Sequence, residues 1–202
     1  MTDVYFTVAG RGESAFKVQG STFICHVTPA KTVVEAETFV ETIREEHADA
    51  THNVPAYRVR DGEFLREYES DANEPSGSAG KPALNALQGG ELENVATVVT
   101  RYYGGTKLGI GGLVSAYSQA VKEAVDDAGV LEERPHERFV VNVEYDDSGT
   151  VRGILESVEA EFEAHYDEHV TFEVRVPKPR ATALKDRLRS VTSGRAEIEE
   201  DE

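Results

Sequence analysis

The order of strand-like and helix-like segments in the last third of the chain constrains the fold more than any other feature. Four short segments alternate apolar and polar residues, as strands do, and two others repeat apolar residues at helical spacing. The order strand, helix, strand, strand, helix, strand is the split βαβ pattern of a ferredoxin-like domain. We expect strands at 138–146, 161–168, 169–177 and 194–200, and helices at 149–160 and 180–191.

The first two thirds of the chain predict a second mixed domain. Thr32 and Glu35 have the spacing of a capping box and mark a helix start. The nearly apolar run of β-forming residues at 94–103 indicates a strand that is covered on both faces. In order, we expect a strand at 21–30, a helix at 32–47, two strands around the turn Asp61–Gly62, a short helix from about Ala83 to Gly89–Gly90, the strand at 94–103 and an amphipathic helix after it.

A polar segment at 131–138 separates the two patterns. It contains Pro135 and follows the amphipathic helix, so we interpret it as a linker. The chain is therefore expected to form an α+β protein with one domain at 1–132 and a ferredoxin-like βαββαβ domain at 136–202.

Five of the nine residues at 104–112, between the apolar strand and the amphipathic helix, are glycines. A strand, a glycine-rich turn and a helix N-terminus together present free N–H groups and a positive dipole end, which suits a phosphate group. The segment is not a P-loop, because Lys107 lies inside it and no G-x-x-x-x-G-K-[ST] pattern is present. A tight turn with close helix–sheet packing is the alternative, and the residues alone leave both open. The glycines are Gly104, Gly105, Gly109, Gly111 and Gly112.

A second segment, 71–83, has the composition of a turn and offers several polar groups. Ser76, Ser78 and Lys81 could bind a phosphate or a ribose, together with free backbone amides. Ser76 and Lys81 could instead be a nucleophile and its base. Their spacing is not that of the known S-x-x-K enzymes, so a binding role is favoured over catalysis.

Acidic residues dominate the composition, and the stretches that contain few of them are candidate binding surfaces. The chain has 38 acidic and 21 basic residues, a net charge of −17, a single cysteine and no tryptophan. Such a composition is typical of a halophilic protein in the cytoplasm, since carboxylates keep a surface hydrated in molar salt; an ordinary acidic protein is the alternative. No apolar run could span a membrane, and the N-terminus does not resemble a secretory signal.

Two stretches contain few acidic residues. A surface that binds an anion is expected to lack acidic residues, because carboxylates would repel the anion. Residues 71–115 carry four acidic and three basic residues, and residues 175–195 carry one acidic and seven basic residues. In the second stretch, Lys185 and Arg189 lie four apart on the expected helix, on the face opposite its apolar residues. This basic face could bind RNA, or its bases could pair with the acidic C-terminal tail or simply face solvent.

The histidines do not predict a metal site. His47 suits the C-terminal end of its helix, and His52 could bond to the backbone or face a cleft. His165 and His169 are four apart, but they flank an expected turn and do not share a helical face, and H-E-x-x-H does not occur, so we expect no metal and no cofactor.

Taken together, the two glycine-containing segments resemble the IMPACT/YigZ family. The family's D-x-x-E-P-S-G-T-A-G-x-P segment is matched by "DANEPSGSAGKP" and its V-x-R-Y-[FY]-G-G-x-x-L-G-x-G-G-L-x-x-A-Y segment by "VVTRYYGGTKLGIGGLVSAY". "ATHNVPAY" and "STFICHV" resemble two further family segments, so the resemblance spans about residues 13–130. Asn73 and Ser78 depart from the usual glycine and threonine, but Asn73 tolerates positive φ and Ser78 keeps the hydroxyl.

The resemblance implies a first domain like domain 2 of ribosomal protein S5, followed by a ferredoxin-like domain similar to one in elongation factor G. It also implies translation as the setting, since eukaryotic relatives regulate translation through a protein partner. RNA or ribosome binding is the usual proposal for prokaryotic members, and the family supplies no agreed catalytic residue.

We therefore expect a non-enzymatic, translation-associated protein that binds RNA or the ribosome. Two alternatives stay open: an enzyme acting on a small phosphorylated metabolite, and an adaptor that binds a protein of the translation machinery. The candidate binding residues are Arg101, Lys107, Gly104, Gly105, Gly111, Gly112, Lys81, Ser76, Ser78, Glu74, His52 and Tyr103 in the first domain, and Lys185 and Arg189 in the second.

Overall fold

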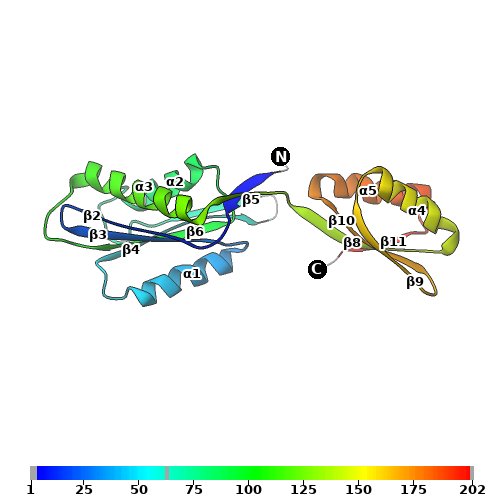
Figure 1. Ribbon diagram of the computed structural model, residues 1–202, viewed down its shortest axis with the longest axis horizontal. Coiled ribbons are helices and arrows are strands. Elements are labelled where there is room, and N and C mark those ends of the chain that lie inside the picture. The colour runs from blue at the N-terminus through cyan, green and yellow to red at the C-terminus, as the bar shows by residue number, and fades with distance from the viewer. Residues whose placement is uncertain (1–3, 62–63, 201–202) are drawn as a thin grey trace. The chain divides into compact units, whose positions relative to one another are not determined.

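The protein has a mixed α+β architecture, as predicted (Figure 1). The structure, a computed structural model, describes residues 4–61 and 64–200. The chain forms two compact units, one at residues 5–133 and the other containing residues 134–200. Among the described residues, no helix combines the length and the apolar character that crossing a membrane requires.

A five-stranded antiparallel sheet forms the centre of the first unit. Its central strand, β6 (Val95–Tyr102), is buried on both faces along nearly its whole length, which confirms the expectation from its apolar sequence. β6 hydrogen-bonds to β3 (Ser21–Pro29) on one side and to β4 (His52–Asp61) on the other. The strand order is β2 (Gly12–Val18), β3 (Ser21–Pro29), β6 (Val95–Tyr102), β4 (His52–Asp61) and β5 (Phe64–Glu69).

Helices cover both faces of this sheet (Figure 1). α2 (Gly80–Gly89) and α3 (Gly109–Ala128) pack on one face, and α1 (Val33–Glu46) packs on the other. The helix cap is confirmed, because Thr32 Oγ1 accepts the Glu35 N–H at 3.1 Å. The return bond of the box is shifted by one residue, since the Glu35 carboxylate accepts the N–H of Lys31 at 2.7 Å. Burial of apolar residues on both faces fixes the ends of β6 and α3, between which the glycine-rich loop lies.

The segment interpreted as a linker is mostly strand. β1 (Tyr5–Val8) pairs antiparallel with β7 (Val130–Glu133), and β8 already begins at His136. The polar residues after α3 satisfy their backbone by pairing with a segment from the start of the chain, which local patterns do not reveal. β2 was not predicted either, whereas β4 and β5 form the expected strand pair. Gly62, in the turn predicted between them, lies outside the described residues.

The second unit has the predicted ferredoxin-like order. Its sheet has the strand order β11 (Glu197–Glu200), β8 (His136–Val143), β10 (Val170–Pro177) and β9 (Glu161–Tyr166), with all neighbours antiparallel. Its core contains Phe139, Leu155, Phe172 and Leu188. The first helix begins at Tyr145, earlier than expected, because two acidic residues in its first turn suit the helix dipole. The elements are β8 (His136–Val143), α4 (Tyr145–Ser157), β9 (Glu161–Tyr166), β10 (Val170–Pro177), α5 (Lys178–Val191) and β11 (Glu197–Glu200).

Candidate functional site

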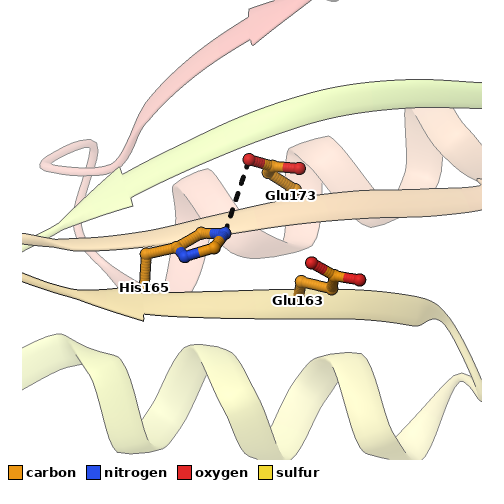
Figure 2. Close-up of side chains that lie close together, drawn as sticks. All are labelled: Glu163, His165 and Glu173. Carbon is orange, nitrogen blue, oxygen red and sulfur yellow. Dashed lines mark ion pairs between the residues drawn. The ribbon is translucent and has the colours of Figure 1, made fainter.

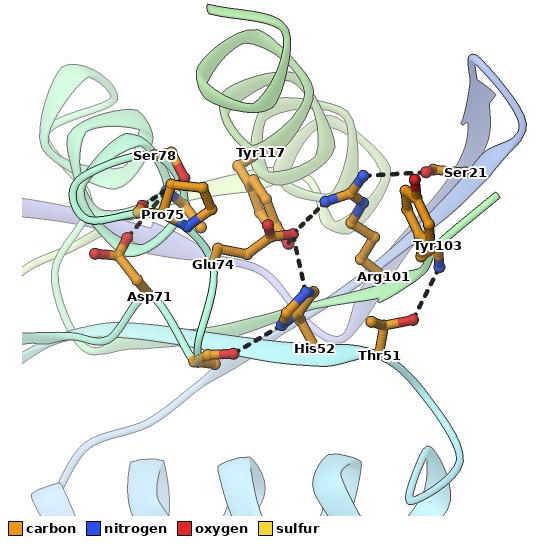
Figure 3. Close-up of polar contacts among 12 residues, drawn as sticks. Ser21, Thr51, His52, Asp71, Glu74, Pro75, Ser78, Arg101, Tyr103 and Tyr117 are labelled. Atoms are coloured by element: carbon orange, nitrogen blue, oxygen red, sulfur yellow. Dashed lines mark hydrogen bonds and ion pairs between the residues drawn. The ribbon is translucent and has the colours of Figure 1, made fainter. Parts of the chain in front are cut away.

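A buried polar network centred on Glu74 lies next to the glycine-rich loop (Figure 3). One carboxylate oxygen, Oε1 of Glu74, accepts hydrogen bonds from Arg101 Nη1 at 2.6 Å and from the Tyr117 hydroxyl at 2.7 Å. His52 Nε2 lies 3.7 Å from the same oxygen. Arg101 belongs to β6, Tyr117 to α3 and His52 to β4, so a single carboxylate ties three elements to the loop that carries it.

Arg101 is held inside this network. Its guanidinium carbon lies 5.5 Å from the ring centres of both Phe23 and Tyr103, and its Nη2 donates to Ser21 Oγ at 3.2 Å. Only 4% of the residue is exposed. We expected Arg101 to meet a phosphate at the surface. In the structure its guanidinium instead neutralises the Glu74 carboxylate, because a buried carboxylate needs a nearby positive charge.

Tyr117 is a member of the network that we did not predict. Burial raises the pKa of its phenol far above the usual range, and the hydrogen bond to Glu74 raises it further. The phenol therefore stays protonated and donates to Glu74. The family-like "GGLVSAY" segment contains this tyrosine, but helical spacing alone places it in the apolar core.

Asp71 organises the loop that carries Glu74. Its two carboxylate oxygens accept the N–H groups of Gly77, Ala79 and Gly80 at 2.7, 3.0 and 2.9 Å. Burial raises the pKa of the Asp71 carboxyl, but these three hydrogen bonds outweigh burial and leave the pKa below its usual value. An aspartate a few residues before Gly and Ser positions is the signal that could have identified it.

The remaining candidates in this loop divide into buried and exposed groups. Ser78 is fully buried and donates to the Pro75 carbonyl at 2.6 Å, and His52 Nδ1 lies 2.8 Å from the Ala72 carbonyl. Ser76 and Lys81 are exposed. Ser78 and His52 thus hold the loop, and Ser76 and Lys81 are open to solvent.

The glycines of the loop have different reasons to be there. A Cβ on Gly104 would lie 1.9 Å from the carbonyl carbon of Gly20, so this glycine allows two turns to touch. Gly105 and Gly109 have φ values of 87° and 72°, which favour glycine. A Cβ on Gly112 would crowd the Leu108 side chain. Gly111 is different, because its φ is not positive and, among the described residues, no atom would lie within 4 Å of a Cβ built there.

The exposed residues of this region form a surface that we call the loop face: Tyr103, Lys107, Ile110, Gly111 and Val114. Tyr103 is 46% exposed and Ile110 63%, and the Tyr103 N–H donates to Thr51 Oγ1 at 2.9 Å. The whole stretch 94–122 contains no Asp or Glu, although the net charge of the chain is −17. The loop face is therefore uncharged apart from Lys107.

In the second unit, Lys185 does not lie where we expected it. Helical spacing predicts Lys185 on the solvent-facing side of its helix, opposite the apolar residues, but only 6% of the residue is exposed. Its Nζ lies over the Phe139 ring and contacts Glu137 Oε1 at 2.6 Å and Glu200 Oε1 at 2.7 Å. The aliphatic stem packs on the core while the ammonium group reaches carboxylates at the edge. Pairing with the acidic tail therefore applies to Lys185, whereas Arg189 is exposed.

These carboxylates also change the titration of Lys185. Burial lowers the pKa of its ammonium group, but the hydrogen bonds to Glu137 and Glu200 outweigh burial and raise it. Lys185 thus keeps its positive charge although its side chain is buried.

Among the described residues, one group has the donor atoms for a metal ion: Glu163, His165 and Glu173 (Figure 2). Its donor atoms lie within 4.8 Å of one another, and His165 Nε2 is 3.5 Å from Glu173 Oε1. All three side chains are exposed on β9 and β10. Exposed carboxylates are frequent in so acidic a chain, so we assign no metal to this group.

Two family models match the chain. The Impact N-terminal domain matches residues 19–125, and a domain of unknown function (DUF1949) matches residues 141–195. The chain is 36% identical over 205 residues to the IMPACT family member YvyE of Bacillus subtilis, covering 100% of this chain and 93% of that protein.

Two further relatives cover almost the full chain. An IMPACT family member of Thermus thermophilus is 36% identical, covering 90% of this chain and 99% of the relative. A crystal structure of a hypothetical protein is similar with a TM-score of 0.69 and 27% identity, covering 100% of this chain and 99% of the other. The likeness therefore extends through both units.

Proposed function

Because this chain belongs to the IMPACT family, we propose that it is a non-enzymatic regulator of translation that binds RNA, on the ribosome or free, through its loop face. The observation that carries the proposal is that the exposed residues between Tyr103 and Ser115 include no carboxylate, in a chain of net charge −17. Carboxylates on a surface that approaches phosphates would repel them, so a surface that binds phosphates is expected to lack the acidic residues that dominate this chain.

The groups on the loop face suit a nucleic acid. Lys107 supplies a positive charge, and the first turn of α3 has no acidic residue and no side-chain cap. The exposed ring of Tyr103 is available to stack on a base. Arg101 does not contact the RNA in this proposal, because its guanidinium pairs with Glu74. The same guanidinium packs against the Tyr103 ring and holds that ring in place.

Gly111 supports a close approach to this surface. A glycine inside a helix costs about 0.5–1 kcal/mol relative to alanine. At Gly111 neither positive φ nor a neighbouring protein atom accounts for that cost. A ligand backbone lying against the first turn of α3 would account for it.

Binding is favoured over catalysis because the reactive side chains near the loop are committed to its structure. Glu74 accepts from Arg101 and Tyr117, and the Ser78 hydroxyl donates to a carbonyl. In the second unit, exposed bases of α5 such as Arg189 are proposed as a further RNA contact, and Lys185 is not, because its charge is directed at Glu137 and Glu200.

The test is sedimentation of the full chain with ribosomes from its source, comparing wild type with Lys107→Glu. Lys122→Glu is the matched control, since Lys122 is exposed on α3, about 20 Å along the helix from its start. We expect wild type and Lys122→Glu to sediment with ribosomes and Lys107→Glu to remain near the top. Equal behaviour of the two variants would contradict the proposal, and absence of all three from the ribosome fractions would remove its main support.

A further inference from the structure

A basic groove lies on the surface of the second unit, and its lining residues belong to a different part of the sequence from those of the loop face. It encloses about 530 Å³ beside α5, β8 and β11. Four basic residues line it, Arg138, Lys178, Lys185 and Arg189, together with the carboxylates of Glu137 and Glu200. Its volume is in the range of pockets that hold small ligands.

The charges of the groove are unusual for this protein. Basic residues outnumber carboxylates in its lining, whereas acidic residues outnumber basic ones by 17 in the chain as a whole. Both carboxylates contact Lys185, at 2.6 and 2.7 Å. The groups at the mouth, Arg138, Lys178 and Arg189, are exposed, and Arg189 also contacts Asp186 at 3.4 Å in a solvent-exposed ion pair, which contributes little. The groove thus presents a positive rim around a buried ammonium group.

Glu200 occupies the position of an anionic ligand in this arrangement. Its carboxylate bonds to the buried Lys185 Nζ, but 78% of its own side chain is exposed. It belongs to β11, a four-residue edge strand that pairs only with β8 among the described strands. Glu137, by contrast, is mostly covered and stays with Lys185. An incoming anion could therefore replace Glu200 on Lys185 without leaving the lysine unpaired.

We propose that this groove binds a phosphate group, with Lys185 at its floor, the three exposed bases at its rim and Glu200 as an internal competitor. The phosphate can belong to a small nucleotide or to an RNA backbone. For the RNA backbone the proposal deepens the proposed function and rests on it; for a nucleotide it is independent. Multiple hydrogen bonds from lysine and arginine to phosphate oxygens supply the affinity.

The test titrates the full chain at low salt with two probes, ATP and a short single-stranded RNA, by calorimetry. We expect Arg138→Gln and Arg189→Gln to bind the better probe about tenfold more weakly, the value of one charge-assisted hydrogen bond. Arg187→Gln is the matched control, because Arg187 is exposed on the same helix but does not line the groove. Glu200→Gln should bind about fivefold more tightly, since a nearby like charge is removed.

Each outcome decides the proposal. An affinity for ATP that equals or exceeds the affinity for RNA indicates a nucleotide site. A higher affinity for RNA indicates that the groove binds the RNA backbone. The proposal is overturned if neither probe binds, if Arg187→Gln weakens binding as much as Arg189→Gln, or if Glu200→Gln weakens it. Equal melting temperatures establish that the variants fold. Because all of these variants lie in the second unit, such a failure leaves the Lys107 test of the loop face unaffected.

Discussion

The Glu74 carboxylate shows how single residues determine the site. It is buried, yet it is satisfied by a guanidinium, a phenol and a nearby imidazole from three elements. A buried pair of this kind adds little net stability relative to an apolar core, but removing one partner is costly. The network therefore acts as a rigid support that places Tyr103 and the glycine-rich loop.

Substitution at Glu74 tests this asymmetry. Glu74→Gln leaves the Arg101 charge buried without its counter-charge, and we expect a loss of about 3–5 kcal/mol in the free energy of unfolding. Tyr117→Phe removes one hydrogen bond and should cost about 1 kcal/mol. Urea unfolding of both variants measures the difference. Equal costs would mean that Arg101 does not depend on Glu74.

Asp71 should make stability depend on pH. Its pKa in the folded protein lies below the ordinary 3.8, so its contribution is fully present above the unfolded value and is lost as the pH falls through the lowered one. Asp71→Asn should therefore be less stable than wild type at pH 7, and the gap should close at acidic pH, below about 4. Urea midpoints at several pH values give the gap. A gap that stays constant down to pH 2 would contradict this assignment.

At the scale of elements, the glycine-rich loop joins a buried strand to a helix whose positions are fixed by packing. Gly104 allows close contact with the Gly20 backbone, whereas no atom of the described residues lies within 4 Å of a Cβ built at Gly111. The two glycines therefore separate the structural role of the loop from its proposed binding role.

Two alanine substitutions should have opposite effects on stability. Gly104→Ala places a Cβ into the Gly20 backbone and should destabilise the protein, whereas Gly111→Ala should stabilise it by about 0.5–1 kcal/mol. Under the proposed function, Gly111→Ala also weakens ribosome binding despite its greater stability. Thermal unfolding and sedimentation measure the two effects, and a stable Gly111→Ala that binds like wild type would argue against a close approach at the helix start.

How far the sequence predicts these elements depends on how local their causes are. The helix cap at Thr32 and the buried strand β6 follow from neighbouring residues, and both were predicted. The pairing of β1 with β7 joins residues at opposite ends of the first unit, and no local pattern reveals it.

The candidate site was predicted as a set of motifs but not as a network. The sequence places Glu74 and Arg101 in two motifs that turn out to meet. It cannot tell that they neutralise each other, because that depends on how the loop folds over β6. Lys185 is similar, since its partners Glu137 and Glu200 come from two other strands.

For the whole molecule, charge is the dominant property. A net charge of −17 disfavours the compact state at low ionic strength through self-repulsion, and salt screens that repulsion. We expect the free energy of unfolding to rise as KCl increases from low to molar concentration. Thermal or urea unfolding across a KCl series measures the trend. A protein that loses stability with added KCl would refute the halophilic interpretation.

The most direct measurement of the central claim is photocrosslinking from the loop face. A photoreactive amino acid replaces Ile110, and the same substitution at Val34, an exposed residue of α1 on the other side of the sheet, is the control. After irradiation of each variant with ribosomes, the covalently attached partner is identified. We predict RNA attached at position 110 and little or none at position 34. Attachment of protein alone at position 110, or equal labelling of RNA from both positions, would contradict the claim.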